Sequence, residues 1–208
     1  YNNEEYSVYS IKNGRVYNDL VENVAIINKN IILDKISYQQ KYGELVKSNL
    51  NVVLKKGTPR IKKKINSNLL VLSQGASGND NYFHWLFDIL PKIKICSEVY
   101  KLDQINNFYF SKLHDYQKFF LHTLGLGKIN ILDAKNYRHI EAEKIIAVDH
   151  PWYEKGYILE EVNNMPEWII HWLRDVFLPV AEPFESNEKE KEKPQRVETI
   201  RSNSYGRH

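Results

Sequence analysis

Hydrophobic and polar residues alternate in short runs over the first third of the chain, a spacing that favours β-strands. Three pairs of runs, each separated by turn-forming residues, predict three β-hairpins: Tyr6–Ile11 with Arg15–Tyr17, Val24–Ile27 with Ile31–Leu33, and Asn51–Leu54 with Arg60–Ile65. Asn13-Gly14 suits a type I′ turn in the first hairpin, because both central residues of that turn need a positive φ. The lysines of the third hairpin favour a solvated edge strand.

From Leu69 onward, short apolar strands alternate with segments of helical periodicity. The predicted strands are Leu69–Leu72, Phe108–Phe110, Ile129–Leu132 and Lys144–Val148, and the predicted helices are Asn81–Ile95, Asp115–Leu124 and Pro166–Phe177. Such alternation predicts a layered α/β fold with a largely parallel sheet. We expect Pro91 to kink or end its helix near Leu90, and Gly125–Gly127 to stop the next one.

The sequence also suggests a domain boundary. Residues 1–183 are predicted to form one α/β domain. Residues 184–195 form a predicted linker, because seven of the ten residues in Glu185–Pro194 are charged and none is a large apolar residue; this favours an interdomain linker over a solvated extension of the preceding helix. Residues 196–208 then begin a second domain that we expect to be truncated.

Composition excludes several classes of protein. A single cysteine, Cys96, rules out a disulfide framework and a cysteine-rich zinc site. A formal net charge of +3 is too small to indicate a nucleic-acid partner, and the chain has no apolar run of the length that a membrane-spanning helix needs. Six of the 29 Lys and Arg residues lie in Leu54–Lys64, which contains no acidic residue and is predicted to form a local basic patch.

Common catalytic motifs are also absent. Gly75-Ala-Ser-Gly78 is one residue too short for a nucleophile elbow, and Gly127-Lys128 does not complete a Walker A loop. No Asp-x-Asp pair occurs, which removes the simplest site for a metal that bridges a nucleotide diphosphate. We therefore predict no metal and no cofactor.

One segment, Asn79–Ile93, combines polar residues on one helical face with apolar residues on another. Asn81, His84 and Asp88 share the polar face. The opposite side must be buried and consists of Tyr82, Trp85, Leu86, Ile89, Leu90 and Ile93. A histidine and an aspartate four residues apart on a helix can hydrogen-bond, so either His84 or Asp88 is a candidate general base.

The loop before this helix suits a ligand. Gly75, Ser77 and Gly78 allow the backbone to approach a bound molecule closely, and a helix N-terminus offers unpaired N–H groups. We expect Asn79 or Asp80 to cap the helix.

A purely structural interpretation competes with this one, because a buried His–Asp pair is often only a satisfied polar contact. The remaining internal histidines have no partners evident in the sequence and are expected on the surface or in the core: His114, His122, His139, His150 and His171. Trp168, Trp172 and Phe177 have the helical spacing of core residues, and stacking against a sugar is the alternative role.

The string Asn-Tyr-x-His-Trp-Leu-x-Asp-x-Leu-Pro-Lys at residues 81–92 resembles the hallmark of glycosyltransferase family 61, which includes enzymes of bacterial capsular-polysaccharide synthesis. The following order of strands and helices is similar, and Arg196–Arg207 resembles the arginine motif that opens the second domain in that family. Glu198-Thr199-Ile200 departs from the apolar strand usual before the arginine, and the glycine-rich donor-binding region has no counterpart.

The resemblance implies a GT-B enzyme whose Rossmann-like N-terminal, acceptor-side domain is this chain. It implies inverting, metal-independent transfer from a nucleotide-diphosphate sugar to a glycan acceptor. His84 and Asp88 are then base and orienter in an order left open, and Arg201 and Arg207 face the diphosphate. Gly75, Ser77, Gly78, Asn81 and Tyr82 are expected to bind substrate. The expected location is the cytoplasm, with peripheral association with the inner membrane as an option.

Two other functions compete with catalysis. The basic stretch Leu54–Lys64 is also compatible with a non-catalytic module that binds an acidic glycan or an anionic surface. The chain is alternatively an inactive, truncated pseudoenzyme.

Overall fold

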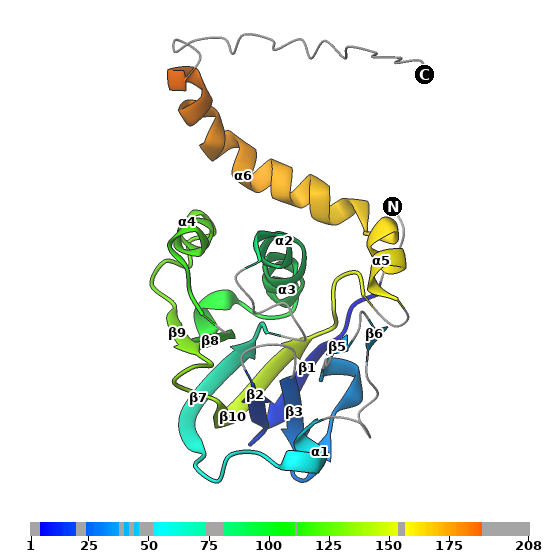
Figure 1. Ribbon diagram of the computed structural model, residues 1–208. Coiled ribbons are helices and arrows are strands. Elements are labelled where there is room, and N and C mark those ends of the chain that lie inside the picture. Colours follow the sequence, from blue (N-terminus) through cyan, green and yellow to red (C-terminus); the bar gives the residue numbers. More distant parts are fainter. Residues whose placement is uncertain are drawn as a thin grey trace, which may run out of the picture.

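The computed structural model describes residues 5–19, 24–37, 40–41, 44–45, 52–73, 81–110, 112–153 and 157–188. Within these ranges, one mixed sheet of eight strands dominates the fold (Figure 1). Its strands are β1 (Val8–Lys12), β2 (Arg15–Asn18), β3 (Val24–Asn28), β4 (Ile31–Ile32), β7 (Lys63–Val71), β8 (Asn107–Phe110), β9 (Asn130–Asp133) and β10 (His139–Val148). β5 (Gln40–Lys41) and β6 (Glu44–Leu45) form a separate antiparallel pair.

The second half of the chain forms the parallel part of the sheet. β7, β8 and β9 lie side by side in chain order, and β10 pairs in parallel with the other side of β7. Leu69 and Val71 pack into one core, and Leu70 and Leu72 pack into the core on the opposite face. β7 is apolar here because both of its faces are buried, as is usual in parallel sheets. The predicted α/β fold class is confirmed at this level.

The helices lie between the strands of the sheet and after the last one. They are α1 (Val52–Lys56), α2 (Tyr82–His84), a π-helical turn (Trp85–Ile89), α3 (Leu90–Ser97), α4 (Asp115–Thr123), α5 (Ile158–Glu161) and α6 (Glu167–Glu188). Short 3-10 turns occupy Asp34–Ile36, Leu102–Gln104 and Val162–Asn164. α2, α3, α4 and α6 gather on one side of the sheet (Figure 1). The helices predicted around residues 81–95, 115–124 and 166–177 are therefore confirmed. The first contains a π-helical turn in its interior, and the other two differ only in their ends.

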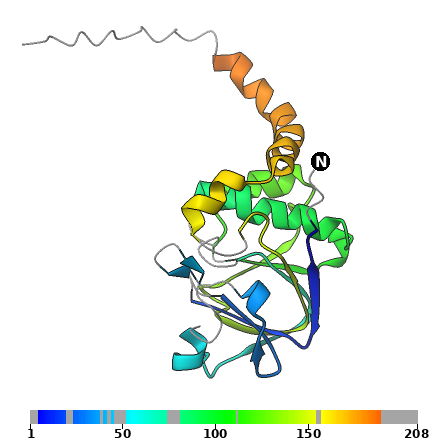
Figure 2. The ribbon, with the colours of Figure 1, turned by 90° about the vertical axis from the view of Figure 1, so that its right-hand side faces the viewer.

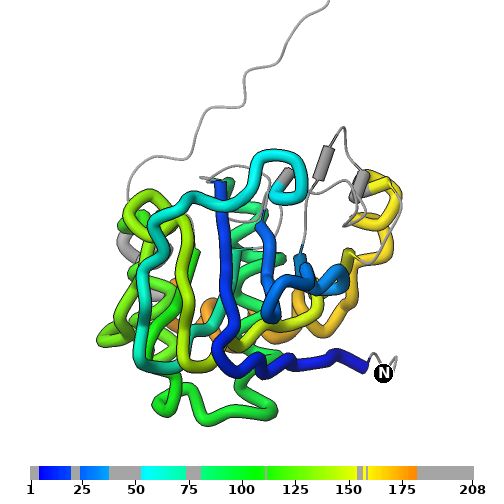
Figure 3. Tube along the Cα trace, turned by 90° about the horizontal axis from the view of Figure 1, so that it is seen from below, coloured from blue at the N-terminus to red at the C-terminus, as the bar shows by residue number. Residues whose placement is uncertain are grey.

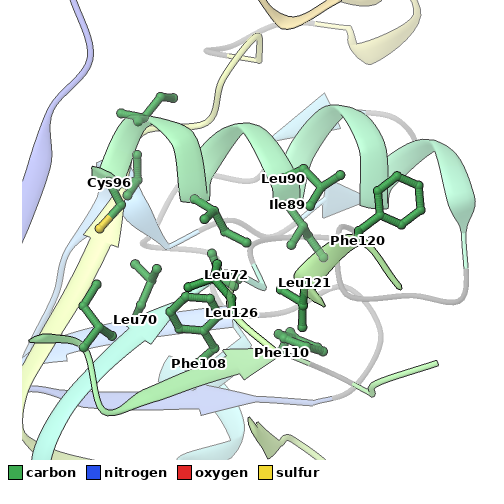
Figure 4. Close-up of a cluster of buried hydrophobic side chains, with 14 of the residues drawn as sticks. Leu70, Leu72, Ile89, Leu90, Cys96, Phe108, Phe110, Phe120, Leu121 and Leu126 are labelled. Atoms are coloured by element: carbon green, nitrogen blue, oxygen red, sulfur yellow. The ribbon is translucent and has the colours of Figure 1, made fainter. Parts of the chain in front are cut away.

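The core between the sheet and these helices is aliphatic and aromatic. Leu70 of β7, Leu72 directly after it, and Phe108 and Phe110 of β8 project toward the helix that carries Leu90 (Figure 4). Phe120 and Leu121 of α4 close the same cluster, and Phe177 of α6 packs against the ring of Phe120. Burial of these side chains holds the helix after β7 on the sheet. Each fully buried large side chain contributes about 1.5–3 kcal/mol of stabilising free energy.

The first predicted hairpin does not form. β1 and β2 both pair antiparallel with β10, so the N-terminal segment lies along β10 (Figure 3). Asn13 has φ 51° and donates its N–H to Glu143 O, but Gly14 is not at positive φ, so the type I′ requirement fails. Gly14 acts as a point of close approach, since a Cβ there would lie 2.9 Å from Ile11 Cγ2.

The second predicted hairpin is confirmed and the third is wrong. β3 and β4 pair antiparallel around Lys29, which has φ 55°. Val52–Lys56 is a helix rather than a strand. The expected second arm of the third hairpin overlaps β7, and so does the strand predicted at Leu69–Leu72, so the two predictions describe parts of one long strand. The pairing of β7 with β8 covers only Leu69–Val71.

The second helix of the parallel region ends as its sequence predicts. Gly125 has φ 74° and donates its N–H to His122 O, while Leu126 donates to Leu121 O. This is the Schellman pattern, which needs a residue in the left-handed region.

α6 is longer than predicted and extends away from the sheet at its C-terminal end (Figure 2). It runs through Glu188, into the range predicted as a charged linker. Residues 189–195 and the predicted second-domain start at 196–208 lie outside the described residues, so the domain boundary stays a prediction.

Candidate functional site

The helix that follows β7 begins at a side-chain cap. Asn81 has an extended backbone, and its Oδ1 accepts the Phe83 N–H at 2.9 Å. This satisfies one of the donors that every helix N-terminus leaves open. Asn81 thus takes the capping role predicted for Asn79 or Asp80, both of which lie outside the described residues.

A single π-helical turn interrupts this helix directly after His84. The N–H of Leu90 bonds to Trp85 O, five residues back, and regular helix resumes through Ser97. Pro91 therefore does not end the helix, because its missing N–H falls where the hydrogen-bond pattern has already shifted by one residue. Trp85 is fully buried beside Phe110 and Phe120, which anchors the turn on the core.

The two residues singled out by their spacing are in contact, one from just before the π turn and one from within it. His84 Nδ1 lies 2.8 Å from Asp88 Oδ2. The Asp88 side chain is 3% exposed and that of His84 is 15% exposed, so His84 is the member of the pair that reaches the surface. The predicted His–Asp contact is confirmed as geometry.

A second segment, the loop that follows β10, contacts the same carboxylate. Trp152 donates its indole N–H to Asp88 Oδ1 at 2.7 Å. His150 Nε2 lies 3.5 Å from Asp88 Oδ2, and His150 Nδ1 accepts the main-chain N–H of Tyr153 at 3.0 Å and of Trp152 at 3.5 Å. Asp88 is thus held by groups from two segments far apart in sequence.

These contacts decide the charge state of Asp88. Burial works to raise the pKa of this carboxyl, but His150 and His84 outweigh it and hold the pKa well below its usual range. Burial lowers the pKa of His150 although the neighbouring Asp88 carboxylate acts to raise it, so burial favours the neutral imidazole. The site therefore holds an ionised carboxylate that can only accept hydrogen bonds.

Lys92 adds an unusual cation one helical turn after Asp88. It is fully buried, and its Nζ donates to Leu72 O at 3.3 Å, at the end of β7. Burial lowers the pKa of Lys92 to about 7, with Asp88 acting in the opposite direction. An amine with a pKa near neutrality changes its charge within the physiological range.

The site lies at a characteristic place in the sheet. The chain leaves β7 toward β8 on one side, and β10 lies on the other, so β7 and β10 flank a switch in strand order. Leu72 follows β7, and His150 and Trp152 follow β10, at the carboxyl ends of two parallel strands. Open α/β sheets bind ligands at such switch points.

The other predicted site residues divide into two groups. Tyr82 is 52% exposed and packs its ring against Tyr116 and Phe120, so the expectation that it is buried is wrong. Asn81 and Tyr82 both lie at the exposed start of the His84 helix. The loop residues Gly75, Ser77 and Gly78 and the arginines Arg201 and Arg207 lie outside the described residues.

The basic stretch is partly neutralised by neighbouring side chains. Lys62 forms an ion pair with Glu141 of β10, and Lys64 Nζ lies 3.9 Å from the same carboxylate. Lys63 Nζ lies 4.2 Å above the ring of Tyr137. These lysines lie at the opposite end of β7 from the Asp88 site.

Sequence reasoning missed His150, Trp152 and Lys92. His150 was expected on the surface or in the core without a partner, but it is buried against Asp88. One signal was available: polar residues directly after an apolar parallel strand lie at the edge where ligands bind. A second was the spacing of Lys92 from Asp88, which places both on one helical face.

Three findings concern metal binding, membrane spanning and similarity to known proteins. In the described ranges, no cluster of three or more His, Cys, Asp or Glu side chains has the geometry of a metal site. No helix among the described residues is long and apolar enough to cross a membrane. No family model, curated protein or solved structure matches the chain.

Proposed function

We propose that this chain is the acceptor-side domain of an inverting, metal-independent glycosyltransferase of the GT-B type, with a Rossmann-like fold. The observation that carries the proposal is the contact of His84 Nδ1 with the ionised carboxylate of Asp88. It is supported by the place of the pair at the carboxyl ends of β7 and β10 and by the family resemblance of residues 81–92.

The geometry favours His84 over Asp88 as the base. An ionised carboxylate is an acceptor, so the contact at 2.8 Å requires the proton of the His84 imidazole to be on Nδ1. Nε2 of a neutral His84 then carries the lone pair. Asp88 is engaged by His84, Trp152 and His150 and is nearly inaccessible, which suits an orienting role.

The proposed reaction balances as a single displacement. The acceptor hydroxyl gives its proton to His84 Nε2 while its oxygen forms a bond to the anomeric carbon. The bond between that carbon and the diphosphate oxygen breaks, and the nucleoside diphosphate leaves with the electron pair. With no metal proposed, the leaving charge needs cationic or N–H donors, a role that we assign to Arg201, Arg207 and the loop with Gly75, Ser77 and Gly78.

The binding-module alternative has less support. Lys62 and Lys64 share Glu141, which lowers the positive charge that the stretch presents to an anionic ligand. An inactive pseudoenzyme is the outcome if transfer is never observed. We therefore retain glycosyl transfer as the function that this geometry supports best.

The test is a transfer assay with the complete protein in which this chain occurs, using a panel of nucleotide-diphosphate sugars and glycan acceptors without added metal. His84→Ala should remove transfer while the far-ultraviolet circular dichroism of the protein stays the same. His122→Ala is the matched control, because His122 lies on α4, outside the Asp88 site. Equal turnover by His84→Ala and wild-type protein would contradict the proposal.

A further inference from the structure

We propose that His150 is a positioning residue of the same site, which orients Asp88 and, through it, the proton of His84. This inference rests on the proposed function for its catalytic consequence, but its structural part does not. His150 would touch neither substrate nor donor. It would act from the loop after β10 on a carboxylate that belongs to the helix after β7.

The first step concerns which nitrogen of His150 carries the proton. Nδ1 accepts two main-chain N–H groups, from Tyr153 at 3.0 Å and from Trp152 at 3.5 Å. A main-chain N–H can only donate, so Nδ1 must be unprotonated. Burial favours the neutral imidazole. The proton of this neutral ring is therefore on Nε2, the atom that faces Asp88.

The second step concerns what that proton does. Nε2 lies 3.5 Å from Asp88 Oδ2, the oxygen that also contacts His84 Nδ1 at 2.8 Å. Trp152 from the same loop occupies the other carboxylate oxygen at 2.7 Å. A carboxylate with donors from two directions cannot rotate about its terminal bond without losing contacts. The distance of 3.5 Å is long for a hydrogen bond, and such contacts often shorten when a substrate is bound.

The third step concerns how the loop itself is held. His150 is 6% exposed, Tyr153 is fully buried, and the rings of His150 and Tyr153 lie 5.8 Å apart in an edge-to-face arrangement. His150 thus has two separable contributions. Its Nδ1 anchors its own loop, and its Nε2 orients Asp88. A merely structural residue needs the first, and a positioning residue also needs the second.

Two substitutions separate these contributions because their side chains differ in length. His150→Asn can place an amide oxygen near the position of Nδ1, which keeps an acceptor for the main-chain N–H groups but loses the donor to Asp88. His150→Gln can place an amide N–H near Nε2, which keeps the donor. If His150 positions Asp88, transfer by His150→Gln stays within about fivefold of wild type while His150→Asn loses about 100-fold. The reverse order would overturn the inference.

A second measurement does not depend on activity. Imidazole ¹⁵N spectra of the wild-type protein should show His150 with a protonated Nε2 and a bare Nδ1 from pH 6 to pH 8. A protonated Nδ1, or a doubly protonated ring across that range, would overturn the inference even if both variants failed to fold. If wild-type protein transfers no sugar, the proposed function fails, and the ¹⁵N spectrum still decides the placement of the proton on His150.

Discussion

Two carboxylates, Asp88 and Asp149, lie at the same end of the sheet. Both are contacted by several donor groups, but the donors differ in kind. Asp149 accepts the Ser7 N–H at 2.9 Å, the Tyr9 hydroxyl at 3.0 Å and the Lys35 ammonium at 3.2 Å. Asp88 has contacts from two imidazoles and an indole. Each carboxylate is thus contacted by three donor groups, but only those around Asp88 include a ring with a second nitrogen left for chemistry.

The two sets of donors differ because adjacent residues after β10 face opposite sides of the sheet. Asp149 and His150 are neighbours directly after β10, and neighbouring residues of an extended chain face opposite sides of a sheet. Asp149 meets the N-terminal strand, whereas His150 meets the helix side and Asp88. The comparison teaches that a buried carboxylate is not by itself a sign of catalysis. The chemistry of its donors decides what it can do.

Asparagine substitutions of the two carboxylates, Asp88→Asn and Asp149→Asn, should differ most in their effect on sugar transfer. Asp88→Asn should reduce transfer by about 1000-fold, because the amide presents a donor to one of the ring or indole N–H groups and no longer fixes the His84 proton on Nδ1. The measurement is single-turnover transfer by folded protein. A loss below tenfold would show that transfer does not depend on Asp88.

The two carboxylates also differ in the lysine near them, since Lys92 is buried near Asp88 and Lys35 is exposed beside Asp149. Lys92→Met should stabilise the protein, because the wild-type fold buries an amine whose pKa is about 7 when folded and 10.5 ordinarily. Between these values the unfolded chain holds more protons, so wild-type stability rises with pH and the advantage of the variant shrinks. Urea unfolding should show a gain larger at pH 6 than at pH 9 by about 3 kcal/mol.

The control for Lys92 is Lys35→Met, at the other carboxylate. The Lys35 side chain is 65% exposed, so its ion pair with Asp149 should contribute under about 1 kcal/mol. A gain from Lys92→Met that is the same at both pH values would refute the buried, titrating amine.

Asp149→Asn is expected to change stability rather than chemistry. The substitution sets an amide N–H against the Ser7 N–H, the Tyr9 hydroxyl or the Lys35 ammonium, at a cost of about 2 kcal/mol in the free energy of unfolding. Transfer per folded molecule should stay at the wild-type level at a temperature below the unfolding transition. A 100-fold loss of transfer would remove the distinction between the two carboxylates.

A further pair of substitutions removes a single hydrogen bond from each carboxylate. Trp152→Phe keeps an aromatic ring in the loop but removes the N–H donor to Asp88, so transfer should fall about tenfold. Tyr9→Phe removes a donor to Asp149 in the same way and should leave transfer unchanged. Steady-state kcat for both variants checks this pair, and equal effects would count against a specific role for the Trp152 donor.

The parts of the site that follow local rules could be predicted from the sequence. His84 and Asp88 are one helical turn apart, so their contact depends on local geometry. His150 meets Asp88 only because β10 inserts beside β7 rather than after β9, and strand order cannot be read from local spacing. Asn13-Gly14 failed as a hairpin for the same reason, since β10 offered both arms a longer partner.

We propose that Asp88 fixes the His84 imidazole with its proton on Nδ1 and its lone pair on Nε2. The most direct measurement is the imidazole ¹⁵N spectrum of His84 at pH 8 in wild-type protein and in Asp88→Asn. We expect a protonated Nδ1 and a bare Nε2 in wild type, and a mixture of the two tautomers in the variant. A wild-type ring protonated on Nε2, or identical spectra for both proteins, would contradict the account.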